Sequence, residues 1–228
     1  LDNCPGKSPL VFYCKGALLL KLGKAGEAAA AFRQGENACP DYCFPTQLEE
    51  LEILEEAIRV LGTAPMAHYY LGCLLYDKKR CQEAAGHWET AVQQRPDLAM
   101  AWRNLAIYRY NKEQNSSGAK EAMERALALE PDHLRFLLEY DQLSARLGIS
   151  AKQRLAVLES HPGLVEQRDD LTLRQITLWN REGRYQEALD SLLSRRFHPW
   201  EGGEGKVSAQ YRRALIHLAY QLLEKGSP

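Results

Sequence analysis

The chain has 228 residues, of which 45% are hydrophobic and 26% charged, so it can bury a core and lacks the composition of a disordered segment. Its 29 basic and 30 acidic residues are interspersed, which argues against nucleic acid or an anionic membrane surface as the partner. The apolar stretch at 11–22 is short and contains Lys15 and Lys21, so it does not predict a membrane span. We therefore expect a soluble, cytoplasmic chain.

The cysteines predict free thiols in a reducing compartment. An even count can indicate disulfides, but a chain of this size and helical character does not need them. A zinc site is the alternative for the first four, although their spacings are not the CxxC pairs of structural zinc sites. We expect no metal and no cofactor. The six cysteines are Cys4, Cys14, Cys39, Cys43, Cys73 and Cys81.

A repeated spacing of small, aromatic and proline residues decides the predicted fold. From Gly16, twelve residues lead to Ala28, four more to Phe32, three more to Gly35 and five more to Pro40. Small residues let two paired helices approach closely, the aromatic side chain fills the gap between them, and proline ends the second helix.

The same spacing occurs twice more along the chain. One match starts at Gly72, and the other starts at Ala106 with one inserted residue in the turn. Three matches predict tetratricopeptide repeats, an all-α solenoid of antiparallel helical hairpins. The further matching positions are Ala84, Trp88, Ala91 and Pro96, then Ala119, Met123, Ala126 and Pro131.

The rest of the chain also reads as helical, without the period-two alternation of half-buried strands. A leucine-rich helix is inserted at about 46–62, within a repeat region at 1–131. The continuous region at 132–228 holds degenerate hairpins, a weaker fourth repeat at about 170–196 in which Arg195 replaces the usual small residue, and a C-terminal helix that caps the stack.

The inner, concave face of such a stack is the expected binding surface. Tyrosines offer rigid contact area, amides pair with an extended backbone, and an arginine can bind a carboxylate through two bonds. The alternative is that half of these tyrosines belong to the core. Helix positions on this face predict nine partner-binding residues: Tyr69, Tyr76, Asp77, Arg103, Asn104, Tyr110, Asn111, Asn180 and Arg181.

A glycine-rich loop at 197–206 is the other specialised segment. It reads Phe-His-Pro-Trp-Glu-Gly-Gly-Glu-Gly-Lys, so a tight fold can present His198, Trp200, Glu201 and Glu204 together. Two carboxylates beside an aromatic ring suit acid/base or sugar-binding chemistry. The competing interpretation is structural, with Trp200 filling the end of the solenoid and Glu201 paired with Arg195 or Arg196. No nucleotide, zinc-protease or hydrolase motif is found, so we expect no catalytic residue.

Charged residues at 168–170 are predicted to be structural. Asp169 or Asp170 is expected to act as the N-cap of a helix, where a carboxylate also suits the helix dipole. Glu139 and Asp141 are expected to pair with Arg168 across the preceding hairpin.

Several segments resemble one bacterial group of long tetratricopeptide-repeat proteins. The matching segments are Asp41–Pro45, Tyr69–Gly72 with Leu75–Lys79, Trp102–Leu105, Arg168–Leu171 and the 197–206 loop. In that group, a β-rich amino-terminal domain of unknown function, suspected of a carbohydrate-related role, precedes the repeats. The resemblance, and the start at Leu1 rather than methionine, imply the repeat half of a longer protein, with no catalytic residue assigned.

Two functions therefore remain open. The leading one is a scaffold that binds a protein or peptide, or the β-rich domain of its own full-length protein, on the concave face. The alternative is a helical module that completes a carbohydrate-active or sugar-binding site through the 197–206 loop.

Overall fold

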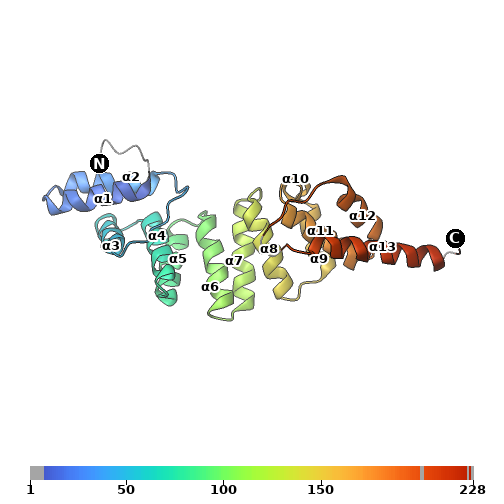
Figure 1. Ribbon diagram of the computed structural model, residues 1–228. Helices are drawn as coiled ribbons and strands as arrows, with labels where there is room; N and C mark the ends of the chain where they lie inside the picture. Colours follow the sequence, from blue (N-terminus) through green and yellow to red (C-terminus); the bar gives the residue numbers. More distant parts are fainter. Residues whose placement is uncertain (1–7, 201–202, 225, 227–228) are drawn as a thin grey trace. The chain divides into compact units, whose positions relative to one another are not determined.

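The computed structural model describes residues 8–200, 203–224 and 226, and this part of the chain contains thirteen helices and no strand (Figure 1). It divides into two compact units, unit 1 at Leu1–Leu129 and unit 2 at Glu130–Pro228. The all-α solenoid of helical hairpins predicted from the repeat spacing is confirmed.

Unit 1 contains three helical hairpins and one additional helix. Each hairpin pairs two consecutive helices over most of their length, as the repeat spacing predicts. The additional helix α3 (Glu49–Leu61) follows the first hairpin and packs against α1, α2 and α4, so the inserted helix is part of the stack. The hairpins are α1 (Pro9–Lys21) with α2 (Ala25–Asn37), α4 (Pro65–Asp77) with α5 (Cys81–Gln94), and α6 (Ala99–Asn111) with α7 (Ser116–Leu129).

Glycines at the close-contact positions explain the repeat spacing. A Cβ atom added to Gly72 would lie 2.5 Å from the Trp88 ring and 3.0 Å from the carbonyl oxygen of Ala84. A Cβ atom on Gly16 would collide with the Phe32 ring in the same way. Trp88 is 3% exposed, and its indole N–H donates to the carbonyl oxygen of Tyr69 at 3.2 Å. The small and aromatic positions of the motif are therefore direct partners.

The start of α4 is held by side chains from other helices. Its N-cap residue is Ala64, whose side chain cannot accept a hydrogen bond. Glu36 of α2 instead accepts from the backbone N–H groups of Met66 and Ala67, at 2.9 and 2.8 Å. Gln94 accepts from the N–H of Ala64 at 2.8 Å. The first and second hairpins are thus joined by hydrogen bonds that bypass α3.

The described part of unit 2 contains six helices, of which the last three pack around a common core. Ile176, Ala188, Leu192 and Ala214 form this core, which joins α11, α12 and α13. The helices are α8 (Leu134–Arg146), α9 (Ala151–Glu159), the short α10 (Pro162–Val165), α11 (Asp169–Arg181), α12 (Tyr185–Ser194) and α13 (Lys206–Glu224).

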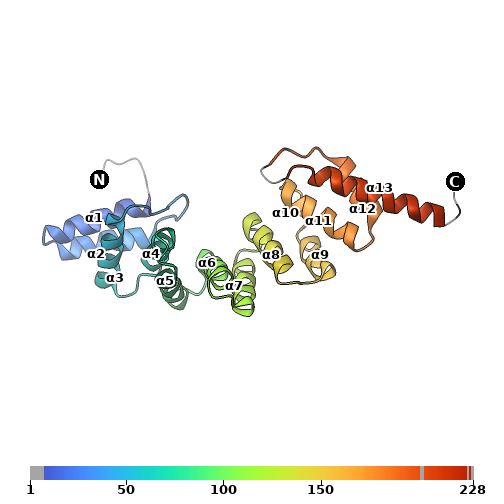
Figure 2. The ribbon, with the colours of Figure 1, turned by 60° about the horizontal axis from the view of Figure 1, so that its bottom comes forward.

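Helix α13 packs on α11 and α12, the helices of the predicted fourth repeat, as expected of a capping helix. Only Ala214 of this helix is buried. Its second half extends beyond the helices that it contacts, and Leu222 and Leu223 are exposed there (Figure 2).

A buried ion pair joins α8 to α9. Asp141 is 1% exposed and accepts from Arg154 at 2.8 and 2.9 Å, and it also accepts from Arg174 of α11 at 2.7 Å. The expected pairing of Asp141 and Glu139 with Arg168 is therefore wrong: Glu139 pairs with Arg135, one turn away on its own helix. The Asp141 carboxylate is buried between α8 and α9, where Arg154 is its partner.

Candidate functional site

Two of the predicted groove residues in unit 1 lie inside the structure. Tyr69 and Asn104 are each 8% exposed. The Asn104 amide donates to the Cys73 thiol at 3.5 Å and accepts from Arg103 at 3.0 Å. Burial, together with the Cys73 thiol, raises the pKa of Tyr69. These two side chains support the surface from below and offer little area to a ligand.

The other groove residues of unit 1 reach the surface to different degrees. Tyr76 is half-buried because its ring packs on Trp88, with 5.4 Å between the ring centres. Arg103 and Tyr110 are also half-buried, while Asp77 and Asn111 are exposed. In this part of the predicted groove, the tyrosine rings are partly accessible and the polar groups of Asp77 and Asn111 are exposed to a partner.

Asn180 has a structural role in unit 2. It is 1% exposed, and its amide nitrogen donates to the backbone oxygen of Gln210 at 3.1 Å and to the side chain at 3.0 Å. Asn180 thus fixes α13 on α11 and leaves no surface for a partner, which removes it from the predicted groove. Its neighbour Arg181 is exposed and lines a pocket.

That pocket, here named the α11 pocket, has a volume of about 550 Å³ and lies within unit 2. Side chains from α8, α9 and α11 form its walls, together with Trp200 from the loop and Lys206 from the start of α13. It therefore combines Arg181 of the predicted groove with Trp200 of the predicted loop site. The lining residues are Leu138, Gln142, Ala145, Arg154, Asp170, Leu173, Arg174, Thr177, Leu178, Arg181, Trp200 and Lys206.

The α11 pocket carries an excess of positive charge. Asp141 is shared between two guanidinium groups, those of Arg154 and Arg174, so this cluster keeps a positive charge. Neither Arg181 nor Lys206 has an ion-pair partner in the described part of the chain, and both are exposed.

The carboxylate on the pocket wall is already neutralised. Asp170 accepts two bonds from Arg168, at 3.0 and 2.7 Å. Burial raises the pKa of Asp170, but the bonds from Arg168 outweigh it and hold the pKa below its ordinary value. Asp170 is therefore ionised and matched by Arg168, and it cancels little of the pocket's positive charge.

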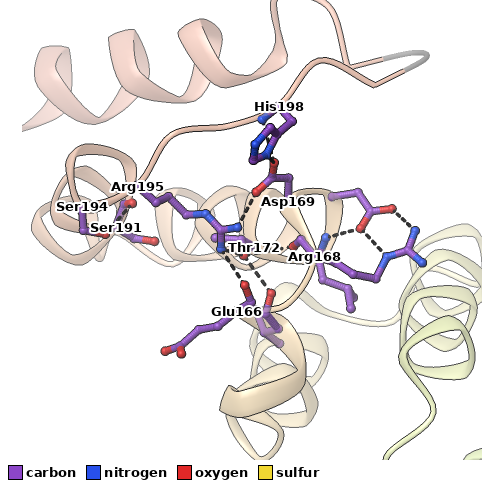
Figure 3. A network of polar contacts seen from close by, with 11 residues as sticks. Glu166, Arg168, Asp169, Thr172, Ser191, Ser194, Arg195 and His198 are labelled. Atoms are coloured by element: carbon purple, nitrogen blue, oxygen red, sulfur yellow. Dashed lines mark hydrogen bonds and ion pairs between the residues drawn. The ribbon is translucent and has the colours of Figure 1, made fainter.

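The 197–206 loop is attached to α11 by one carboxylate. Asp169 accepts from the backbone N–H of His198 at 2.7 Å and lies 3.1 Å from the His198 ring nitrogen Nδ1, and its other oxygen pairs with Arg195 (Figure 3). Burial raises the pKa of Asp169, but the bonds from His198 and the charge of Arg195 lower it more. The His198 ring is 90% exposed apart from this contact.

Arg195 is the centre of this network. Its guanidinium also donates to the carbonyl oxygen of Glu166 at 3.0 Å and to the Thr172 hydroxyl at 2.7 Å (Figure 3). Arg195 stands where the repeat pattern expects a small residue. Its hydrogen bonds and ion pair connect the end of α12 to the start of α11.

The expected N-cap of α11 is wrong. The N-cap is Arg168, because Asp169 already belongs to the helix and uses its carboxylate for Arg195 and His198. The expected pairing of Glu201 with Arg195 or Arg196 falls on Glu201, which lies outside the described residues, and Arg195 pairs with Asp169.

Loop residues at 197–200 and 203–205 border a second pocket of about 550 Å³. Trp200 is half-buried and folds over Gly203, where a Cβ atom would collide with the indole ring. Glu204 is exposed at the edge of this pocket, and Phe197 and Tyr211 add two further aromatic walls. Trp200 thus separates the second pocket from the α11 pocket.

Sequence reasoning missed most of the polar lining of the α11 pocket. Arg174, Thr177 and Arg181 are spaced by three and four residues, so they share one face of α11. That spacing was visible in the sequence. Gln142 and Lys206 come from other helices, and only the tertiary structure brings them to this site.

Two histidines of unit 1 form a contact that the sequence did not predict. The Nδ1 atoms of His68 on α4 and His87 on α5 lie 2.9 Å apart, so one ring donates to the other. Burial lowers the pKa of His68 to about 4, with His87 adding to the effect. Within the described residues, no group of three or more histidine, cysteine or acidic side chains is arranged to hold a metal ion.

The hairpins and their close-contact residues define a tetratricopeptide-repeat solenoid. No known protein-family model matches the sequence. The fold is similar to that of YrrB, described as a TPR protein with an unusual peptide-binding site, with a TM-score of 0.57 and 18% identity over 75% of this chain and 84% of YrrB. It is also similar to PilF of Pseudomonas aeruginosa, with a TM-score of 0.53 and 16% identity over 95% and 92%.

These likenesses establish the fold alone. None of the helices in the described ranges combines the length and the apolar character that crossing a bilayer requires.

Proposed function

We propose that this chain is a protein-interaction scaffold that binds an extended segment of another polypeptide, with the α11 pocket as its main contact. The observation that carries the proposal is the pocket itself, with a volume of about 550 Å³, an aromatic wall at Trp200, and the side chains of Arg181 and Lys206, which have no ion-pair partner among the described residues. Pockets with apolar walls and a few converging polar groups are the usual form of a ligand site.

The pocket is also held in position before any partner arrives. Asp141 fixes Arg154 and Arg174 from behind, so two of its guanidinium groups are already ordered. A preformed site costs less ordering entropy on binding than a flexible one. The similarity to YrrB, a protein described as having a peptide-binding site, supports the same proposal by analogy of fold.

Unit 1 offers a separate candidate contact of its own. Asp77 and Asn111 are exposed, so they can form hydrogen bonds with polar groups of a partner. The partner is a peptide or a folded domain that presents such a segment, and a β-rich domain of a longer protein is one candidate. The five described cysteines are free, which favours a reducing, cytoplasmic location.

Photo-crosslinking of a displayed peptide library tests the proposal. A photoreactive residue is placed at Thr177, inside the α11 pocket, and in a matched variant at Lys152, which is exposed on α9 outside the pocket. Random octapeptides selected on the intact chain should crosslink at 177 and not at 152. A selection that enriches no peptide, or crosslinking at both positions alike, would show the proposal to be wrong.

A carbohydrate-related role of the 197–206 loop is the second candidate, and one observation favours it. Phe197, Trp200 and Tyr211 surround the second pocket with Glu204 at its edge, and aromatic rings beside a carboxylate suit a sugar. His198 also lines this pocket, where Asp169 accepts from its backbone N–H and lies 3.1 Å from its ring nitrogen Nδ1. A glycan panel probed with the parent chain and with Trp200→Ala tests this candidate, and binding by the parent alone would support it.

A further inference from the structure

We infer that the segment bound in the α11 pocket is acidic, and that a carboxylate of an aspartate or glutamate side chain lies between Arg174, Arg181 and Lys206. This inference rests on the proposed function, because it names the chemistry of the partner at the same site. Three features of the pocket support this inference: its hydrogen-bond donors on one face of α11, its positive charge, and the apolar residues beside the charged groups.

The first feature is the arrangement of donors along α11. Arg174 and Arg181 are seven residues apart, two helical turns, so both side chains belong to the same helix face and line the same pocket. Asp141 accepts from Nη1 of Arg174 at 2.7 Å, which leaves the other nitrogens of this partly exposed guanidinium available. Lys206 adds an ammonium group from the start of α13.

The second feature is charge. The Asp141 carboxylate is buried behind the pocket and divided between two guanidinium groups, while Asp170 is matched by Arg168. With a neutral ligand, Arg181 and Lys206 would have no counter-charge from the described part of the chain. A carboxylate would supply one, and hydrogen bonds between charged partners are about twice as strong as neutral ones.

The third feature separates an acidic peptide from a bare anion. Leu138, Leu173 and Leu178 line the same pocket as the charged groups, and Trp200 forms a wall. An extended segment that carries an apolar residue near its carboxylate would fill both parts. A bare anion such as inorganic phosphate would leave this apolar part of the pocket uncovered.

The test uses the intact chain and a displayed library of random octapeptides. Selected sequences should be enriched in aspartate and glutamate relative to the unselected library. One enriched peptide is then synthesised with a fluorescent label, and its Kd is measured by anisotropy. Replacing its glutamates by glutamine should weaken binding at least about tenfold, and raising the salt concentration should weaken binding of the acidic form only.

A matched pair of variants assigns the binding to the pocket. Arg181→Ala with Lys206→Ala removes one arginine and one lysine from the pocket, and binding should weaken at least about tenfold. Lys152→Ala with Arg196→Ala removes the same charges from exposed positions of unit 2 outside the pocket, and binding should stay within about twofold. Circular dichroism and urea unfolding confirm that both variants are folded.

The outcomes separate the inference from the proposed function. If selected peptides bind but show no acidic enrichment, or if the pocket variant binds them normally, the acidic inference is overturned while peptide binding stands. If a phosphoserine version binds more tightly than the glutamate version, the carboxylate assignment is wrong. If nothing is enriched, the proposed function fails as well.

Discussion

Asp141 and Arg154 form a buried ion pair with two parallel hydrogen bonds, Nε to Oδ1 at 2.8 Å and Nη2 to Oδ2 at 2.9 Å. The side chains are 1% and 8% exposed, so each charge depends on the other for its compensation. Arg174 donates a third bond to the same carboxylate. The stability of unit 2 and the position of two pocket arginines therefore depend on one aspartate.

Replacing this aspartate should destabilise unit 2 strongly. Asp141→Ala leaves the buried Arg154 without a counter-charge, and we expect a loss of about 3–5 kcal/mol in the free energy of unfolding. Urea unfolding followed by circular dichroism measures the loss. Asp132→Ala is the matched control, because Asp132 is exposed, and it should change stability by less than about 0.5 kcal/mol. Similar results for the two variants would contradict a structural role of the ion pair.

Replacing either of two glycines on neighbouring helices by alanine should change the stability of the protein, in opposite directions. Gly72→Ala places a methyl group against Trp88 and the Ala84 backbone, and overpacking should cost about 1–3 kcal/mol. Gly86 on α5 has no atom within 4 Å of an added Cβ, so Gly86→Ala should stabilise the helix by about 0.5–1 kcal/mol. Thermal unfolding of both variants measures these changes. If Gly72→Ala leaves the stability unchanged, the predicted close contact of Gly72 with Trp88 is wrong.

Loss of the Asp169 carboxylate should release the segment that follows α12. Asp169→Ala removes the acceptor of the His198 backbone N–H and the partner of Arg195. Hydrogen exchange at residues 195–200 should become faster, while exchange in α8 stays unchanged. Asp190→Ala, a change of the same type on α12 where the carboxylate accepts from Gln186 one turn away, should leave the segment protected.

The histidine contact in unit 1 should make stability depend on pH. The folded pKa of His68 is about 4, below the ordinary value near 6.5, and that of His87 is also lowered by burial, against the raising influence of Glu55 and Glu83. Unfolding therefore takes up protons, so this stabilisation is complete above pH 6.5 and is lost as the pH falls toward 4.

Urea unfolding of unit 1 at pH 7 and pH 4.5 measures this effect. We expect the pair to contribute on the order of 1–2 kcal/mol to the difference between these pH values, since His87 is partly exposed to solvent. His68→Leu with His87→Leu removes the titrating groups and should reduce the pH dependence by that amount. An unchanged pH dependence would rule out the pair as its source.

The hairpin fold could be predicted because each motif position has a local cause. The spacing from Gly72 to Trp88 records a direct contact between two consecutive helices, so it survives in the sequence as a fixed distance. The structural role of Asp169 could not be predicted in the same way. Its partners Arg195 and His198 are 26 and 29 residues away, and no spacing rule connects them.

The candidate site was predictable only in part. The position of Arg181 near the end of a first helix of a hairpin indicated the groove, and the composition of the loop indicated Trp200. Their meeting in one pocket depends on where α13 begins and on how Trp200 folds over Gly203. Tyr69 and Asn104 occupy groove positions in the repeat pattern, yet neighbouring side chains bury them. Helix periodicity alone does not predict this burial.

The hydrogen bonds from Glu36 to the start of α4 have a consequence for how unit 1 opens. If α1 and α2 separate from the stack, the N–H groups of Met66 and Ala67 lose their acceptor, and the first turn of α4 frays with them. The first two hairpins therefore behave as one cooperative unit in local unfolding, although a whole helix separates them along the chain.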